Sequence, residues 1–249
     1  MLPKCHFLRR TCVPLFLLLA APAAFCGMPG QHETRDGDEI VVAGQFFHTG
    51  TKVVLWMDPG GYDAYRVQRR FVPNEHAGAG NMRPRYGMRD AKLTAAQLEQ
   101  VRGGGWDLPT LQSTVDQFVL HFDVEGISQA CFKVLQDRAG LSVHLMLDLD
   151  GTVYQTLDLK EKAWHATSSN NRSVGVEIAN VGAYTNVDNT PLATWYKKDA
   201  NGQRTIVIPK SFGPHPERTA HFAGHPARRE LILGDLQGKK LRQYDFTPQ

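Results

Sequence analysis

Residues 163–180 read AWHATSSNNRSVGVEIAN. The stretch begins with a Trp-His pair, Trp164 and His165, and a short polar loop then leads into an apolar run from Val174 to Ile178. Small and β-branched residues in such a run predict a strand. The run contains one acid, Glu177, and a buried carboxylate is costly unless a cation or a metal-bound water compensates it. Glu177 is therefore the first candidate for a functional role.

The composition is that of a globular protein with a modest charge. The chain has 249 residues, of which 42% are hydrophobic, so it can form one large domain or two small ones. The formal net charge is only +3. Basic residues are scattered apart from Arg66 to Arg70 and Arg228 to Arg229, and no aromatic interleaving or reader motif accompanies them. We interpret these runs as solvated faces and expect no nucleic-acid partner.

The first residues have the plan of a secretory signal peptide. Basic residues precede an apolar stretch, Pro14 to Leu19, which runs into several alanines. We therefore predict a signal peptide over residues 1–26, a Gly- and Pro-rich linker over residues 27–38 and one domain over residues 39–249. The protein would be exported to the periplasm, the cell envelope or the extracellular space. No later segment is long and apolar enough to span a membrane.

The cysteines do not predict a disulfide framework. Removing the signal peptide would remove Cys5 and Cys12. Cys131 lies in an apolar helical pattern and is best interpreted as a buried core residue rather than a nucleophile. Lipidation of Cys26 is a weaker alternative, because the bulky Phe25 precedes it.

Local patterns predict strands alternating with helices. Thr94 and Gln97 form a capping box that begins a helix, residues 127–139 have one apolar helical face that ends at Gly140, and Asp150-Gly151 is a hairpin turn. The predicted strands are 40–42, 53–57, 117–122, 143–149, 152–157, 174–179 and a short one at 231–233, the predicted helices are 94–102, 108–115 and 127–139, and the predicted loops are 74–92 and a surface loop at 184–206. This order favours an α/β fold with a mixed central β-sheet flanked by helices.

The order of motifs resembles a known family. The segments FVLHFD (118–123), SVHLMLDLDGTVYQ (142–155), WHA (164–166) and SVGVEI (173–178) follow one another as in the zinc-dependent N-acetylmuramoyl-L-alanine amidases of the bacteriophage lysozyme and peptidoglycan-recognition-protein type. The resemblance covers roughly residues 115–182. It implies a domain that acts on peptidoglycan or muropeptides.

The resemblance also implies roles for two residues. His121, which closes the first motif's strand, corresponds to a zinc ligand, and Glu177 corresponds to the general base. A zinc ion lowers the pKa of its bound water to near neutrality, and a nearby carboxylate can take the water's proton and pass it to the leaving amine. The bond cleaved would be the amide between the muramoyl lactate and L-alanine.

His144, His165 and Asn170 match pocket positions of the family, and their roles remain open. His144 is best interpreted as a hydrogen-bonded structural histidine. Trp164 and His165 are expected to form the wall and floor of a groove for sugar and peptide. Asn170 either binds the peptide stem or caps its own loop. Phe122 and Asp123 replace the polar residues that many relatives have after the first ligand, so local substrate contacts are expected to differ.

The remaining zinc ligands are not evident in the sequence. Zinc needs three protein ligands, and in the family the other two follow a long final helix. Thr247 and Pro248 suit the start of such a helix, so we expect the last helix and both ligands to lie beyond Gln249, and little or no activity without them.

Three alternatives to this interpretation remain. His215, His221 and His225 could act as surrogate ligands, but prolines and a glycine interrupt that segment, and loop histidines are favoured. The chain could instead be a non-catalytic peptidoglycan-binding module of the same fold. A structural envelope protein of unrelated function would require the ordered motifs to be accidental.

Overall fold

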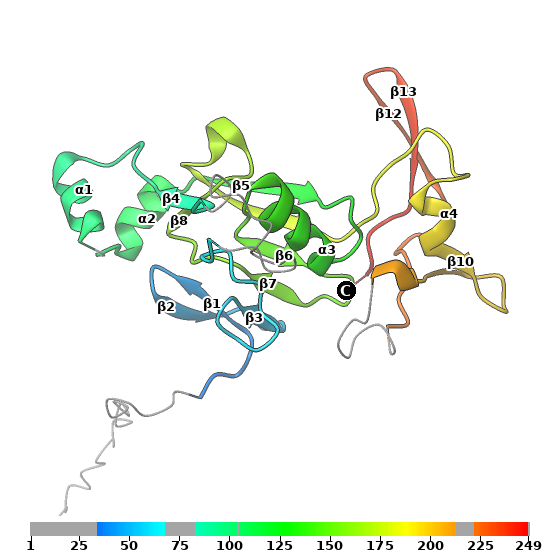
Figure 1. The fold of residues 1–249 in the computed structure, drawn as a ribbon, viewed down its shortest axis with the longest axis horizontal. Helices are drawn as coiled ribbons and strands as arrows, with labels where there is room; N and C mark the ends of the chain where they lie inside the picture. Colours follow the sequence, from blue (N-terminus) through cyan, green and yellow to red (C-terminus); the bar gives the residue numbers. More distant parts are fainter. Residues whose placement is uncertain (1–33, 68–82, 104, 213–221, 249) are drawn as a thin grey trace, which may run out of the picture. The chain divides into compact units, whose positions relative to one another are not determined.

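A central mixed sheet carries the motif-bearing segments. The computed structural model describes residues 34–67, 83–103, 105–212 and 222–248, and all of these except Thr34 belong to a compact unit that starts at Arg35. The sheet has five strands in the order β3-β7-β6-β9-β5 (Figure 1). Strands β6, β9 and β5 are parallel, β7 is antiparallel to β6, and β3 is parallel to β7. The predicted mixed α/β fold is confirmed. The strand bounds are β3 Val53–Leu55, β5 Gln117–Phe122, β6 Leu145–Leu147, β7 Val153–Gln155 and β9 Ser173–Ile178.

The remaining elements surround this sheet or extend it. The helices are α1 Ala95–Arg102, α2 Leu108–Thr114, α3 Ser128–Lys133 and α4 Pro191–Trp195, with a π-helical segment Val134–Ala139 and 3-10 turns Thr167–Ser169 and Lys210–Phe212. The other strands form two-stranded pairs: β1 Glu39–Val42 with β2 Gln45–His48, β4 Tyr86–Met88 with β8 Glu161–Ala163, β10 Tyr196–Lys198 with β11 Arg204–Ile206, and β12 Ile232–Leu236 with β13 Lys239–Gln243.

Helix α3 covers one face of the sheet. Cys131 and Phe132 of the helix pack with Met146 of β6 and Tyr154 of β7 in one apolar cluster. The helix predicted from periodicity is confirmed, but its second half is π-helical, and it ends at Gly140 with a left-handed φ of 66°. Cys131 is 3% exposed, which confirms its core position, and burial raises the pKa of its thiol.

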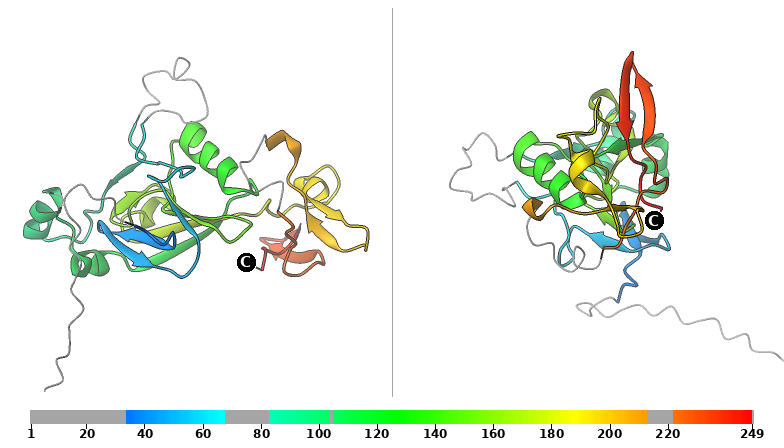
Figure 2. Two further views of the ribbon diagram at one scale, coloured as in Figure 1. Left: turned by 90° about the horizontal axis from the view of Figure 1, so that it is seen from below. Right: turned by 90° about the vertical axis from the view of Figure 1, so that its right-hand side faces the viewer.

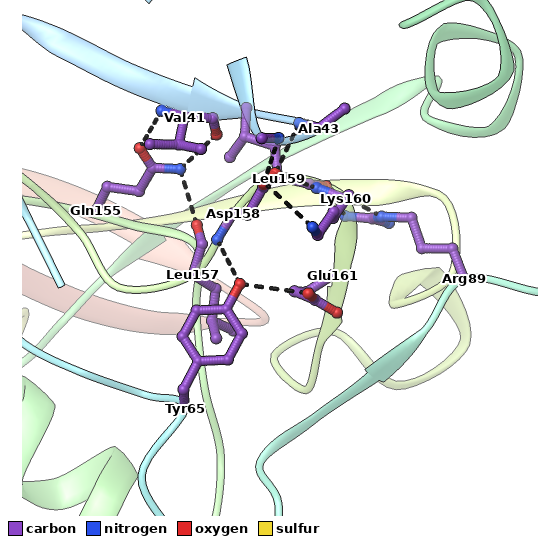
Figure 3. Close-up of polar contacts among 11 residues, drawn as sticks. Val41, Ala43, Tyr65, Arg89, Gln155, Leu157, Asp158, Leu159, Lys160 and Glu161 are labelled. Carbon is purple, nitrogen blue, oxygen red and sulfur yellow. Dashed lines mark hydrogen bonds and ion pairs between the residues drawn. The ribbon is translucent and has the colours of Figure 1, made fainter. Parts of the chain in front are cut away.

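The β1–β2 hairpin lies on the opposite side of the sheet from α3 (Figure 2). Its two-residue turn, Ala43-Gly44, has positive φ angles of 53° and 76°, as tight hairpins require. The amide of Gln155 pairs with both backbone groups of Val41, and the Asp158 carboxylate accepts the N–H groups of Ala43 and Gly44 (Figure 3). The buried segment 155–158 therefore anchors the hairpin to the sheet.

Two short strands lie where the sequence predicted none. Residues 74–92 were expected to be a loop, but β4 lies within them and pairs antiparallel with β8. Each strand has only three residues and no apolar alternation, so periodicity does not reveal them. Their pairing places the segment after β4 beside the Trp-His loop.

The prediction of a surface loop over residues 184–206 is wrong. These residues form α4, β10 and β11, which Figure 1 shows close to the β12–β13 hairpin. Trp195, Tyr196, Ile206 and other apolar residues form a second core with Ile127 and Leu149. The polar residues that suggested a loop occupy the turns between these elements, while the apolar residues between them are buried.

The outer face of β5 is apolar and exposed. Phe118, Leu120 and Phe122 are 59%, 64% and 49% exposed, on the face away from α3. An apolar cavity of about 320 Å³ lies on the same side of the sheet, lined by residues that include Phe47, Leu111 and Val174.

Several predictions fall outside the described residues. These are the signal peptide, most of the linker, the lipidation of Cys26, and His215 and His221. Within the described residues, no helix is long and apolar enough to cross a membrane. Thr247 donates its hydroxyl to the carbonyl of Leu149 at 2.8 Å, and the helix expected to begin there stays a prediction.

Candidate functional site

His121 and Glu177 are side by side on parallel strands. Each is the fifth of six residues in its strand, and the register of β5 and β9 pairs the two directly. Neighbouring strands lie about 4.8 Å apart, so both side chains project from the same face as neighbours. Both residues are half-buried, and the strands end at the same edge of the sheet. The structure thus brings together the two residues for which the motifs predicted chemical roles.

Glu177 has the electrostatics of a proton acceptor. Burial raises the pKa of its carboxyl from 4.5 to about 7, and burial is the cause that accounts for the shift. A general base works best when its pKa lies near the operating pH, because it is then both ionised and basic. The buried strand that made Glu177 conspicuous in the sequence is also what raises its pKa.

His165 contacts His121 directly. The Nδ1 of His165 lies 3.0 Å from the Nε2 of His121, and the two rings are perpendicular. The Nε2 of His165 lies 3.2 Å from the Ser173 hydroxyl. Burial lowers the pKa of His121 and lowers that of His165 to about 4, so both rings are neutral near pH 7.

Gly175 makes room for the His165 ring. A Cβ atom at this position would lie 2.5 Å from the Nδ1 and Cε1 atoms of His165. No side-chain carbon approaches another atom so closely, so the ring occupies the space that any other residue at position 175 would fill. Glycine inside an apolar strand is a known sign of such a close approach.

The loop between β8 and β9 is shaped by Asn170. Its Oδ1 accepts the backbone N–H groups of His165 and Ala166 at 3.1 and 2.7 Å. This is the loop-capping role that the sequence left open, whereas contact of Asn170 with substrate stays a prediction. Trp164 is half-buried, and its backbone pairs with Ser142, which places it next to His165.

Arg89 ties this loop to the rest of the domain. Its guanidinium is fully buried and donates to four backbone carbonyls, at distances between 2.8 and 3.2 Å. The acceptors belong to Leu159, Asn170, Asn171 and Ser173. Burial lowers the pKa of Arg89 to about 10, so it remains a cation at neutral pH. Figure 3 shows Arg89 beside Leu159, which lies two residues before strand β8 begins at Glu161.

His144 is a structural histidine, as the sequence suggested. It is fully buried, and burial lowers its pKa to about 3. The N–H of Gly175 donates to its Nδ1 at 3.1 Å, so the ring proton lies on Nε2 and is donated to the carbonyl of Glu161 at 2.9 Å. The Arg89 nitrogen 2.9 Å from Nε2 is then a close contact rather than a hydrogen bond, because both groups are donors.

Asp123 connects the loops that follow β5 and β9. It is 6% exposed, and one of its carboxylate oxygens accepts the N–H groups of Glu125, Gly126 and Asn180 at 2.9 to 3.1 Å. This oxygen of Asp123 is therefore directed at the backbone, and the expectation that the residues after His121 alter substrate contacts stays a prediction. Asp123 sets the geometry of the sheet edge where His121 and Glu177 lie.

The described residues around His121 offer part of the ligand set that a zinc ion needs. Zinc takes three protein ligands, and His121 offers an imidazole beside the Glu177 carboxylate. Within the ranges that the structure describes, the group that brings three or more ligand residues together consists of Asp36, Asp38, Glu39 and His48, at the β1–β2 hairpin and the segment just before it, and does not include His121. The carboxylates of Asp38 and Glu39 already accept local N–H groups, and Asp38 also pairs with the His48 ring. His225 belongs to no such group among the described residues, and its Nδ1 lies 2.9 Å from the carbonyl of Pro226.

Sequence reasoning missed three residues of this site. Gly175 could have been found, because a glycine in an apolar strand is unusual. Ser173 begins the same strand, and its contact with His165 could not be inferred from spacing. Arg89 lies in a segment expected to be a loop and had no local signal.

One comparison identifies the domain that contains these residues. A family model described as N-acetylmuramoyl-L-alanine amidase matches residues 111–226, from within α2 to Pro226. The match includes β5, β9 and the Trp-His loop, and it confirms the family resemblance seen in the ordered motifs. No curated protein sequence matches the chain.

Proposed function

Because residues 111–226 form a domain of the N-acetylmuramoyl-L-alanine amidase family, we propose that the activity of this domain is hydrolysis of the amide between the muramoyl lactate and L-alanine of peptidoglycan, and that it requires two zinc ligands besides His121, which the described residues do not supply. The observation that supports this most is the pairing of His121 with Glu177 at one sheet edge. Such a substrate implies export to the cell envelope, in keeping with the signal peptide predicted over residues 1–26.

Glu177 is the proposed general base. Its carboxyl, with a pKa of about 7, accepts a proton from the attacking water as the water oxygen bonds to the amide carbonyl carbon. The same carboxyl then gives the proton to the alanine nitrogen as the carbon–nitrogen bond breaks. The products are a free lactyl carboxylate and a free amine on the stem peptide.

Zinc is the proposed cofactor, with His121 as one ligand. When bound, a zinc ion lowers the pKa of water and polarises a carbonyl oxygen. Trp164 and His165 line the proposed groove for sugar and peptide, and Asn170 shapes its loop.

A non-catalytic peptidoglycan-binding module of the same fold is the second candidate. It is favoured by one observation: the described residues around His121 do not complete a set of three ligands. Groove residues could then bind peptidoglycan without hydrolysing it.

The experiment is to incubate the chain with muropeptides and zinc and to measure free stem peptide by mass spectrometry. Hydrolysis that is lost in Glu177→Gln and kept in Glu99→Gln, a matched change on exposed α1, supports the amidase. Retention on insoluble peptidoglycan without release supports the binding module. If neither release nor retention is observed, both candidates are wrong.

A further inference from the structure

A chain of hydrogen bonds leads from His121 into the protein. The Ser173 hydroxyl lies 2.8 Å from the carbonyl of Ser169 and 3.2 Å from the Nε2 of His165. The Nδ1 of His165 in turn lies 3.0 Å from the Nε2 of His121. Each contact needs one donor and one acceptor, so fixing one proton fixes the rest.

The proton positions follow from the carbonyl at the end of the chain. A carbonyl can only accept, so the single hydroxyl proton of Ser173 is donated to Ser169. The Nε2 of His165 must then carry a proton and donate it to the Ser173 oxygen. A neutral imidazole has a single ring proton, so with that proton on Nε2 the Nδ1 of His165 is an acceptor, and His121 donates to it from Nε2. The unprotonated nitrogen of His121 is therefore Nδ1.

We propose that His165 is a positioning residue that fixes His121 as the Nε2–H tautomer and so presents Nδ1 as the metal-binding atom. This inference rests on the proposed zinc-dependent function. Histidines that bind metals commonly donate their second ring N–H to a partner, which fixes both the tautomer and the ring orientation. Here the partner is another imidazole, which Ser173 orients.

The surroundings of His165 restrict it to this arrangement. Gly175 leaves the space that the ring occupies, Asn170 binds the backbone N–H of His165, and Arg89 binds the carbonyls of Asn170 and Ser173. His165 thus has little freedom to rotate away from His121.

Nitrogen NMR of the metal-free chain tests the tautomer directly. We expect a slowly exchanging Nε2–H on His121 and a scalar coupling across the hydrogen bond to Nδ1 of His165. His225 provides an internal reference of the opposite tautomer, because its Nδ1 donates to the carbonyl of Pro226. An Nδ1–H proton on His121 would overturn the proposal.

Variants separate positioning from folding. Ser173→Ala should weaken the coupling and make the His165 and His121 tautomers heterogeneous, whereas Ser169→Ala, which keeps the accepting carbonyl, should leave both unchanged. Equal spectra for the two variants would refute the relay. Backbone spectra with shifts unchanged outside the site show that each variant is folded.

Zinc titration tests the metal-binding atom. The shift on adding zinc should appear at Nδ1 of His121, and His165→Ala should weaken zinc binding about 10- to 100-fold. A shift at Nε2 would refute the assignment. If no zinc binds to the wild type, the proposed cofactor fails, while the tautomer and coupling still decide whether the relay exists.

Discussion

Replacing Gly175 by alanine should displace His165 without removing any polar group. The added Cβ would lie 2.5 Å from two atoms of the His165 ring, where ordinary van der Waals contact begins near 3.4 Å. Either the ring or strand β9 has to move by about an ångström. Because β9 is hydrogen-bonded to both β5 and β6, we expect the ring to move and its contact with His121 to be lost.

The cost of this displacement can be isolated with a second glycine. Overpacking a buried site typically costs about 1–3 kcal/mol. Alanine also restricts the unfolded chain, which stabilises by about 0.4–1 kcal/mol wherever the backbone tolerates it. A Cβ added at Gly234 in β12 would meet nothing within 4 Å, and the φ of Gly234 is not left-handed. Gly234→Ala should therefore show only the stabilisation that comes from restricting the unfolded chain. The difference between the two variants should therefore be about 1–3 kcal/mol.

Urea denaturation measures this difference. The slope of the unfolding free energy against urea concentration should be equal for both variants, which shows that they expose the same surface area on unfolding. The His121 to His165 coupling should disappear in Gly175→Ala and persist in Gly234→Ala. If Gly175→Ala is as stable as Gly234→Ala and keeps the coupling, the close approach of the His165 ring to β9 is wrong.

Three other changes test the site and the second core. Glu177→Gln should be more stable than the wild type at pH 8, and this gain should vanish below pH 4.5. The pKa of the Glu177 carboxyl is raised to about 7 in the folded protein, so the wild type loses stability as the pH rises from 4.5 to 7. The midpoints of urea unfolding at pH 4 and pH 8 measure the difference. Arg89→Met leaves four buried carbonyls without their hydrogen-bond donor and should lower the free energy of unfolding by at least about 3 kcal/mol. Arg102→Met on exposed α1 should change it by less than about 0.5 kcal/mol. Trp195→Ala should cost about 3–5 kcal/mol if residues 184–206 are part of a packed core, and a near-zero cost in thermal unfolding would contradict that core.

The sequence predicted best where a segment has a strong local pattern. Strand β5 was predicted with its observed bounds, and the Thr94 capping box is present as expected. A hairpin joins β6 to β7 through Asp150 and Gly151 as expected, but its hydrogen-bonded turn runs from Asp148 to Gly151. These features depend on neighbouring residues alone, so a single sequence contains them. Glu177 was identified for the same reason, because one charge in an apolar strand is visible without knowing the fold.

Features that depend on distant partners could not be predicted in this way. Strands β4 and β8 are three residues long and exist because they pair with each other across a long stretch of chain. Arg89 has no distinguishing neighbours, and its role arises only when the loop before β9 folds around its guanidinium. The second core was missed because turn residues separate Trp195 and Tyr196 from the residues they pack against.

The site therefore combines two kinds of support. His121 and Glu177 lie on adjacent parallel strands, and their spacing is set by the sheet. His165 lies on a loop, and its position depends on Arg89, Asn170 and the missing side chain at Gly175. A substitution that disturbs the sheet should displace His121 and Glu177 as well as His165 and should destabilise the fold. A substitution in the loop should release His165 while the pairing of His121 and Glu177 persists. The tautomer of His121 is thus the property most sensitive to the loop, and it can change without a change in the backbone of either strand.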